Sequence, residues 1–135
     1  MADETVTAAD VVIQSGSMGQ GTAGASITQG MPIYEDAGDS NKLKPADNSS
    51  AAKANVRGIA LNAAENGQPV LYVKSGEYDP GFTPTAGTVY VVSSNAGKIC
   101  AMADLASTNY VTVIGVGKDA NTLTMGPIVT GAQVP

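Results

Sequence analysis

The chain has 135 residues, enough for one domain with a single core, and its seven basic and twelve acidic residues give a net charge of −5. This acidic excess argues against binding to free nucleic acid, and no apolar run approaches the roughly 18 residues that a membrane span requires. The chain contains no histidine, which excludes Ser-His-Asp and Cys-His catalytic arrangements.

Residues 1–26 are predicted to form an N-terminal arm with a glycine-rich hinge. The acidic start, MADETVTAAD, lacks the basic and apolar regions of a secretory signal. With a single cysteine, Cys100, this favours synthesis in a reducing cytoplasm. Glycines at positions 16, 19, 21 and 24 predict flexibility, and the run ADVVI is suited to pairing with the strand edge of another molecule.

Residues 27–135 are predicted to form a β-rich body of short strands. Segments rich in β-branched residues alternate with Gly, Asn, Asp and Pro, which is typical of strands joined by turns. Including one strand in the arm, the predicted strands are residues 11–13, 31–35, 56–61, 69–73, 88–93, 98–102, 110–116, 122–125 and 127–129. Only SSAAKAN, residues 49–55, favours a helix of one or two turns, with Asp47 and Asn48 as capping residues.

An internal repeat aligns residues 27–83 with residues 84–131 at a constant offset of 57. The aligned pairs include Gly30 with Gly87, Gly58 with Gly115, Ile33 with Tyr90, Val56 with Val113 and Ile59 with Val116. The repeat predicts an all-β, pseudo-twofold barrel or sandwich in which two similar units close one core. The segment YVTVIGV, residues 110–116, is apolar on both faces, so we expect another sheet or a neighbouring subunit to cover each side.

Three local patterns suggest chemistry but lack the context that the chemistry needs. Residues 19–24 spell G-x-G-x-x-G, yet ASITQGMP follows instead of a helix, which predicts a loop rather than a dinucleotide site. Glu35, Asp36 and Asp39 do not have the spacing of an EF-hand and predict a solvated turn. Cys100, within KICAM, is expected to be a small buried apolar residue.

A pair of carboxylates is the arrangement that would still allow catalysis without histidine. Glu77 and Asp79, in SGEYDPGF, are the strongest candidates, although they flank a Gly/Pro turn where carboxylates are normally solvated. We expect no enzyme activity, no catalytic residues, no metal and no cofactor. A carboxylate-based hydrolase remains the less favoured alternative.

Four segments resemble the head decoration, or capsid cement, proteins of tailed bacteriophages. They are AGASITQGMPIYEDA, VRGIALNAAENGQPVLYV, TPTAGTVYVVSSNAGKICAMADL and YVTVIGVGKD, and they cover about residues 20–118. The resemblance rests on Gly, Tyr and β-branched positions. It implies a compact β-rich protein, often a homotrimer, that is made in the bacterial cytoplasm and binds the outer surface of the expanded head. There it would clamp neighbouring subunits of the major capsid protein, and the family has no active site to carry over.

On this interpretation the arm becomes ordered against the shell or an adjacent subunit. The expected partner contacts are Thr5, Val6, Val11, Val12 and Ile13. Tyr34, Tyr72 and Tyr90 are either interface anchors or part of the protein's own core. A carbohydrate-binding or adhesive virion module is the alternative function, but the chain has only 4 % aromatic residues for stacking on sugars.

Overall fold

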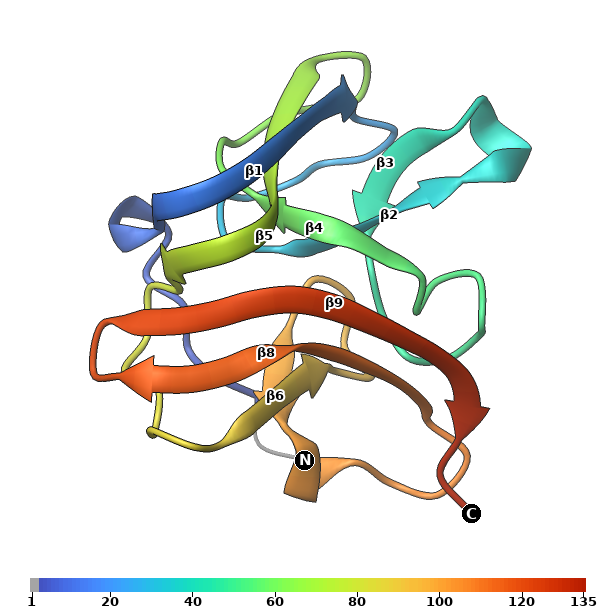
Figure 1. The fold of residues 1–135 in the computed structure, drawn as a ribbon. Helices are drawn as coiled ribbons and strands as arrows, with labels where there is room; N and C mark the ends of the chain where they lie inside the picture. Colours follow the sequence, from blue (N-terminus) through green and yellow to red (C-terminus); the bar gives the residue numbers. More distant parts are fainter. Residues whose placement is uncertain (1–2) are drawn as a thin grey trace.

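The computed structural model describes residues 3–135 and consists almost entirely of β-strands (Figure 1). The nine strands are β1 (Val12–Thr22), β2 (Pro32–Asp36), β3 (Lys42–Pro45), β4 (Val56–Ala60), β5 (Pro69–Asp79), β6 (Val89–Val92), β7 (Ile99–Ala101), β8 (Tyr110–Asp119) and β9 (Thr122–Gln133). The helical elements in this range are three single 3₁₀ turns, Ala8–Asp10, Ala37–Asp39 and Met102–Asp104. The predicted all-β class is therefore confirmed, and residues 3–135 contain no helix with the length and apolar character to cross a membrane.

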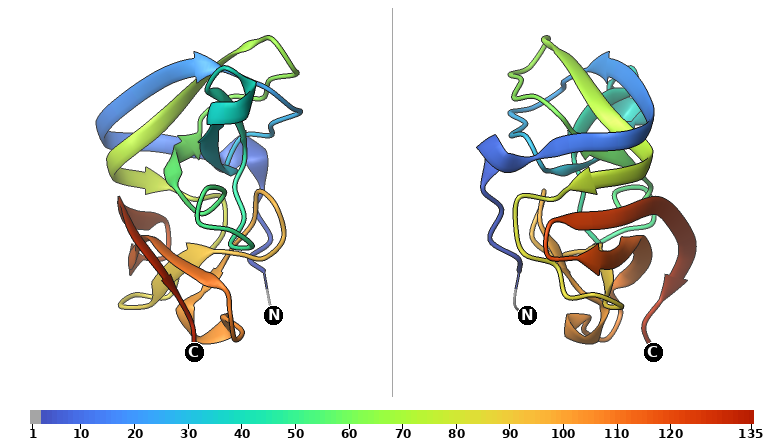
Figure 2. Two further views of the ribbon diagram at one scale, coloured as in Figure 1. Left: turned by 90° about the vertical axis from the view of Figure 1, so that its right-hand side faces the viewer. Right: turned by 60° about the vertical axis from the view of Figure 1, so that its left-hand side comes forward.

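All nine strands belong to one curled antiparallel sheet. Its strand order is β3-β2-β4-β5-β9-β8-β6-β7, and β1 pairs along β5. The curl brings the residue after β1 back to β3, where Ala23 forms a parallel bridge with Leu43 and the Gly24 N–H donates to the Leu43 carbonyl at 2.8 Å. The views in Figure 2 show β1 and β5 bending together around this side of the molecule. The sheet is thus a half-barrel that nearly closes in its N-terminal part.

The two halves of the sheet pair their strands in the same way, so the order from one end, β3-β2-β4-β5, is equivalent to the order from the other end, β7-β6-β8-β9. The first half is β2–β5 and the second half is β6–β9. At the offset of 57, the pairs Pro32–Ile59, Ile33–Gly58 and Tyr34–Val56 correspond to Val89–Val116, Tyr90–Gly115 and Val91–Val113. Each set contains a register shift at the same place. The equivalence thus extends from sequence spacing to the position of a β-bulge.

The sequence predicted one core, whereas the buried apolar residues form two clusters. The main core lies between the halves and includes Tyr34, Val56, Ile59 and Val73 from the first and Tyr90, Val92, Ile99, Ile114, Leu123 and Met125 from the second. A smaller cluster fills the curl of the first half: Ala23, Ile27, Ile33, Leu43, Ala60, Ala64, Val70 and Tyr72. The first half is therefore buried on both of its faces.

Residues 12–22 differ from the predicted flexible arm, because they form β1 on the protein's own sheet. Gly16 and Gly76 face each other across β1 and β5 with φ angles of 131° and 118°. A Cβ on Gly16 would lie 2.0 Å from the Ser75 carbonyl oxygen, so two backbones meet where no side chain fits. The glycines in this segment serve close packing of β1 against β5 rather than a hinge.

Two further predictions about local structure need correction. Residues 49–55 form hydrogen-bonded turns and not a helix. The Ala54 N–H donates to the Ser50 carbonyl at 3.0 Å, and the Asn55 N–H donates to the Ala52 carbonyl at 3.3 Å. The predicted strands 122–125 and 127–129 are one strand, β9, and the short strand β3 was not predicted. β3 contains two lysines and no β-branched residue, so its sequence lacks the pattern by which the other strands were predicted, although it pairs with β2.

Candidate functional site

The N-terminal segment before β1 is fastened to the second half of the sheet and to the segment that joins the two halves. The Glu4 N–H donates to the Ile99 carbonyl at 2.8 Å, and the Thr7 N–H donates to the Gly81 carbonyl at 2.8 Å. The Asp3 carboxylate accepts hydrogen bonds from the Ser93 hydroxyl and the Asn95 amide. This segment is a strap across the body and not a free arm.

The five residues expected to contact a partner divide into two groups. Val11 is 2 % exposed in the main core, and Val6 and Ile13 pack against that core. Thr5 is exposed, and Val12 is 55 % exposed on β1. Thr5 and Val12 are therefore the most accessible of the five, Val6 and Ile13 are half-buried, and Val11 is inaccessible to another molecule.

The ribbon formed by β1 and β5 carries exposed apolar side chains, and its edge strand β1 has no charged residue, whereas β5 also exposes Lys74. Besides Val12, Met18 is 53 % exposed on β1 and Leu71 is 45 % exposed on β5. Residues 11–34 contain no charged side chain. Within residues 3–135 the strand pairs of β1 are all with β5, which leaves its other edge uncovered along most of its length. We call Val12, Met18 and Leu71 the ribbon surface.

A second apolar surface lies on the outer side of β6, β8 and β9, beside the Glu77–Lys118 ion pair. Cross-strand pairing places its residues in two rows on the same face: Val89–Val116–Thr124 and Val91–Val113–Ile128. Val91 is buried and Val89 and Val113 are half-buried, but Val116 is 39 % and Ile128 is 60 % exposed. We call Val89, Val113, Val116, Thr124 and Ile128 the β8–β9 face.

The edge of β9 beside this face is protected against pairing with an additional strand. β5 pairs with β9 only at Leu123–Met125, so the following residues have one unpaired edge. Pro127 has no N–H to donate, and Gly131, with φ of 68°, lies in a bulge that the Thr130 hydroxyl fixes on the Val111 carbonyl at 2.7 Å. Proline and bulges are common protections of sheet edges. Contacts in this region therefore depend on side chains of the face.

Charge divides the molecule as clearly as burial does. From Pro80 to Pro135 the charged residues are Lys98, Asp104, Lys118 and Asp119, which cancel. Residues 1–79 hold the other ten acidic and five basic residues, and thus the whole net charge of −5. The second half is electrically neutral and the N-terminal part is acidic.

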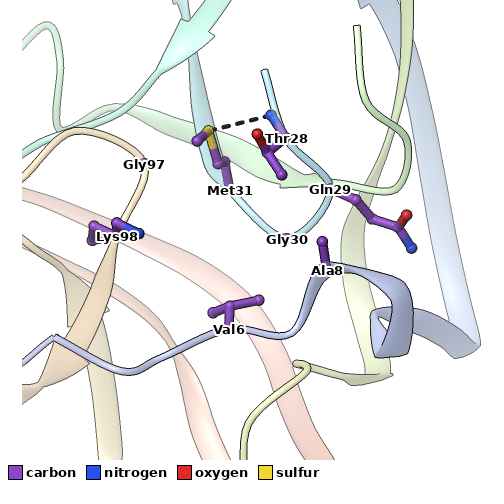
Figure 3. Close-up of a pocket in the computed structure, with 8 residues that line it drawn as sticks. All are labelled: Val6, Ala8, Thr28, Gln29, Gly30, Met31, Gly97 and Lys98. Carbon is purple, nitrogen blue, oxygen red and sulfur yellow. Dashed lines mark hydrogen bonds between the residues drawn. The ribbon is translucent and has the colours of Figure 1, made fainter. Parts of the chain in front are cut away.

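A small pocket lies where the strap, the turn before β2 and the turn before β7 meet (Figure 3). Its volume is about 130 Å³, and it is lined by Val6, Ala8, Thr28, Gln29, Gly30, Met31, Gly97 and Lys98. Lys98 is the sole charged residue among these, and the drawn hydrogen bond joins the Thr28 N–H to the Met31 sulfur at 3.4 Å. Sites for small-molecule ligands usually exceed about 300 Å³. Neither its size nor its chemistry identifies the pocket as a catalytic site.

The carboxylates singled out in the sequence are engaged in structural contacts. Glu77 forms an ion pair with Lys118 at 2.8 Å, and Asp79 accepts the Gly81 N–H at 3.0 Å. They do not flank the pocket.

In the acidic turn after β2, two carboxylates form ion pairs with a lysine of the same chain. The Lys44 ammonium lies 2.7 Å from Asp36 and 3.2 Å from Asp39. Its hydrogen bond to Asp36 lowers the pKa of that carboxyl, and the same contacts raise the pKa of Lys44. No group of three or more metal-ligating side chains occurs within residues 3–135.

Other residues considered in the sequence belong to the interior. Cys100 is fully buried, which confirms the expectation of a small apolar residue, and burial raises the pKa of its thiol to about 11. Tyr34, Tyr72 and Tyr90 are between 2 % and 7 % exposed and pack in the protein's own core. The G-x-G-x-x-G residues end β1 and precede no helix.

No protein-family model matches the sequence, and no curated protein is significantly similar to it. The resemblance to phage decoration proteins therefore stays a prediction based on the motifs themselves.

Proposed function

We propose that this protein decorates the head of a tailed bacteriophage, where it binds the outer surface of the expanded shell and stabilises contacts between major capsid protein subunits. The observation that carries the proposal is the ribbon surface, three exposed apolar side chains of which Val12 and Met18 lie on the uncharged edge strand β1. Such surfaces are typical of protein interfaces. The motif resemblance supplies the class of partner.

Binding would gain its strength from repetition. A single ribbon surface is small, but several linked copies on one lattice bind with a high effective concentration. Because only the expanded lattice presents the correct spacing, binding stabilises that state by mass action. The protein would be made in the bacterial cytoplasm and would reside on the outside of the virion.

The two alternative functions have less support. A carbohydrate-binding module presents exposed aromatic rings, whereas all five tyrosines and the single phenylalanine are buried or half-buried. A carboxylate hydrolase needs two free acids across a cleft, and Glu77 and Asp79 are already bonded within the chain.

The test is to mix the purified protein with undecorated expanded heads and look for added density at fixed lattice positions by electron cryomicroscopy. Unexpanded heads are the control for lattice geometry. We expect Met18→Glu and Val12→Glu to reduce occupancy at least tenfold at limiting protein concentration, because each brings a charge into an apolar contact. Ala51→Glu, which adds the same charge on an exposed turn of the first half, should leave occupancy unchanged. The absence of density on any expanded shell would overturn the proposal.

A further inference from the structure

The strands at the margins of the sheet differ in how their outer edges are protected. β7 is covered by the strap, where Asp3 forms an antiparallel bridge with Cys100. β3 is met by the residue after β1, through the bridge between Ala23 and Leu43, and β9 contains Pro127. Covering segments and prolines are devices by which proteins prevent the addition of a further strand. β1 has neither a covering segment along its length nor a proline.

The outer edge of β1 is free because β5 has its other neighbours on the opposite side. Residues 72–73 and 76–78 of β5 pair with β1 and, at the same time, with β4 or β9. β4 and β9 therefore lie along the edge of β5 that faces away from β1. The register shifts of β1 lie at Gln14 and between Ser17 and Met18, and from Met18 to Thr22 its pairing with β5 is regular. A regular strand with a free edge is a template for another strand.

The side chains beside this part of β1 define the chemistry of the strand that fits it. Met18 is 53 % exposed, and Leu71, which is paired with Gln20, is 45 % exposed. Lys74 is exposed at the register shift opposite Ser17 and Met18. Within residues 3–135 its ammonium group forms no ion pair and no hydrogen bond. The edge thus offers two apolar side chains and one cation without a partner.

We infer that β1 binds an extended segment of a partner protein, which adds as a strand along residues 18–22 and carries an acidic residue that pairs with Lys74. The backbone groups of a strand edge are regularly spaced donors and acceptors, and another extended backbone satisfies them in sequence. A carboxylate near Lys74 and an apolar side chain against Met18 or Leu71 then fix the register of the added strand.

Charge argues against a second copy of this chain as the occupant of the edge. If two β1 edges pair, residues 11–34 of the second copy bring no acidic side chain to Lys74. Such pairing also brings two N-terminal parts together, and residues 1–79 of each copy hold the whole net charge of −5. A different protein with an acidic extended segment avoids both disadvantages.

This inference deepens the proposed function, on which the identity of the partner rests: the added strand would belong to a subunit of the shell. In strand addition the main-chain hydrogen bonds contribute affinity, and the alternate side chains contribute specificity. The small ribbon surface would then select one segment of the shell subunit, because its apolar side chains and Lys74 flank the hydrogen-bonding edge.

Selection of linear peptides from a random display library on the immobilised full chain tests the inference without phage heads. We expect the enriched peptides to contain an acidic residue within a run of β-branched or other apolar residues. A synthetic copy of the most enriched peptide should slow hydrogen exchange at residues 18–22 and leave β6 to β8 unchanged. Lys74→Glu should weaken its binding about tenfold in fluorescence anisotropy. Lys53→Glu, at an exposed lysine on a turn of the first half, should not, and circular dichroism checks that both variants are folded.

The inference is overturned if no peptide is enriched, if the hydrogen-exchange footprint lies away from β1, or if the two lysine substitutions weaken binding equally. Protection of residues 18–22 that rises with protein concentration alone also overturns it, because a second copy is then the occupant. Hydrogen exchange of the protein bound to expanded heads separates the two proposals. Head-bound protein with residues 18–22 unprotected overturns this inference alone, while peptide binding at β1 by a protein that ignores all expanded heads overturns only the proposed function.

Discussion

Ile59 in the first half of the sheet is fully buried, whereas Val116 at the equivalent position of the second half is 39 % exposed. Both residues follow a glycine beside a β-bulge, and each pairs with the equivalent residue of the preceding strand, Pro32 or Val89. The difference is made by their surroundings, since the second half covers the first and nothing within residues 3–135 covers Val116 to the same degree. One pairing scheme thus produces a buried face in one half and a partly exposed apolar face in the other.

The largest effect is expected at Gly16 and Gly76, where the backbones of β1 and β5 approach each other closely. The second half has no equivalent of this contact. Gly16→Val would place a Cβ 2.0 Å from the Ser75 carbonyl oxygen and force a branched side chain to a φ of 131°. We expect a loss of about 4 kcal/mol or more in the free energy of unfolding, measured by chemical denaturation.

Gly67→Ala is the matched control for this substitution. Gly67 also has a positive φ, 91°, but nothing lies within 4 Å of a Cβ built there. Backbone strain alone then costs about 1 to 2 kcal/mol. Equal effects of the two substitutions would mean that the close approach of β1 and β5 is not needed for the fold.

A second prediction tests the equivalent positions directly. Ile59→Ala removes a fully buried side chain from the main core and should lower the free energy of unfolding by about 3 kcal/mol. Val116→Ala should cost less than about 1 kcal/mol at low protein concentration. Similar losses at both positions under dilute conditions would contradict the asymmetry of the halves.

A third, smaller effect concerns the link between the halves at Asn48. Its N–H donates to the Ser93 carbonyl at 3.1 Å, its side-chain amide donates to the Val92 carbonyl at 3.2 Å, and its carbonyl accepts the Tyr110 N–H at 3.0 Å. Asn48→Ala removes only the side-chain bond, so we expect a loss of about 1 kcal/mol in thermal or chemical unfolding. Asn121→Ala, on the exposed β8–β9 turn, should change stability by less than about 0.5 kcal/mol.

The sequence predicted the repeat and most strands because Gly and β-branched spacing records pairing and turns. It did not predict that β1 folds back on β5. Glycines at 16, 19 and 21 suggest flexibility locally, but each is required by a distant residue that packs against it, Gly76, Tyr72 and Leu43 respectively. Contacts of this kind depend on long-range packing, which a single sequence does not display.

The exposure of the expected partner contacts was predictable only in part for a related reason. Val11, Val12 and Ile13 form one apolar run in the sequence, but strand alternation turns Val11 and Ile13 inward and leaves Val12 exposed. Ile128 and Val116 look like ordinary strand residues. Their exposure became informative once the repeat identified Val56 and Ile59 as the buried counterparts of the β8–β9 face.

The smallest predicted effect is a difference in the pH dependence of stability at two sites. One is the strap, which contacts the second half, and the other is the acidic turn of the first half. Burial and the nearby Asp104 carboxylate raise the pKa of Glu4 above its ordinary value. The stability that Glu4 contributes is thus fully present below its unfolded pKa and is lost as pH rises through its folded pKa. The Asp36 pKa is lowered by Lys44, so its contribution is present above the unfolded pKa and lost as pH falls through the folded one.

Hydrogen exchange, corrected for intrinsic rates, distinguishes these opposite signs at two amides. The Glu4 N–H, bonded to Ile99, should gain protection on acidification, whereas the Gly38 N–H, bonded to the Asp36 carboxylate at 3.0 Å, should lose it. Glu4→Gln should give neutral-pH protection at residue 4 close to the acid value and leave Gly38 unchanged. If both amides in the wild type respond to pH in the same direction, local carboxylates do not control the two sites, and a global charge effect does.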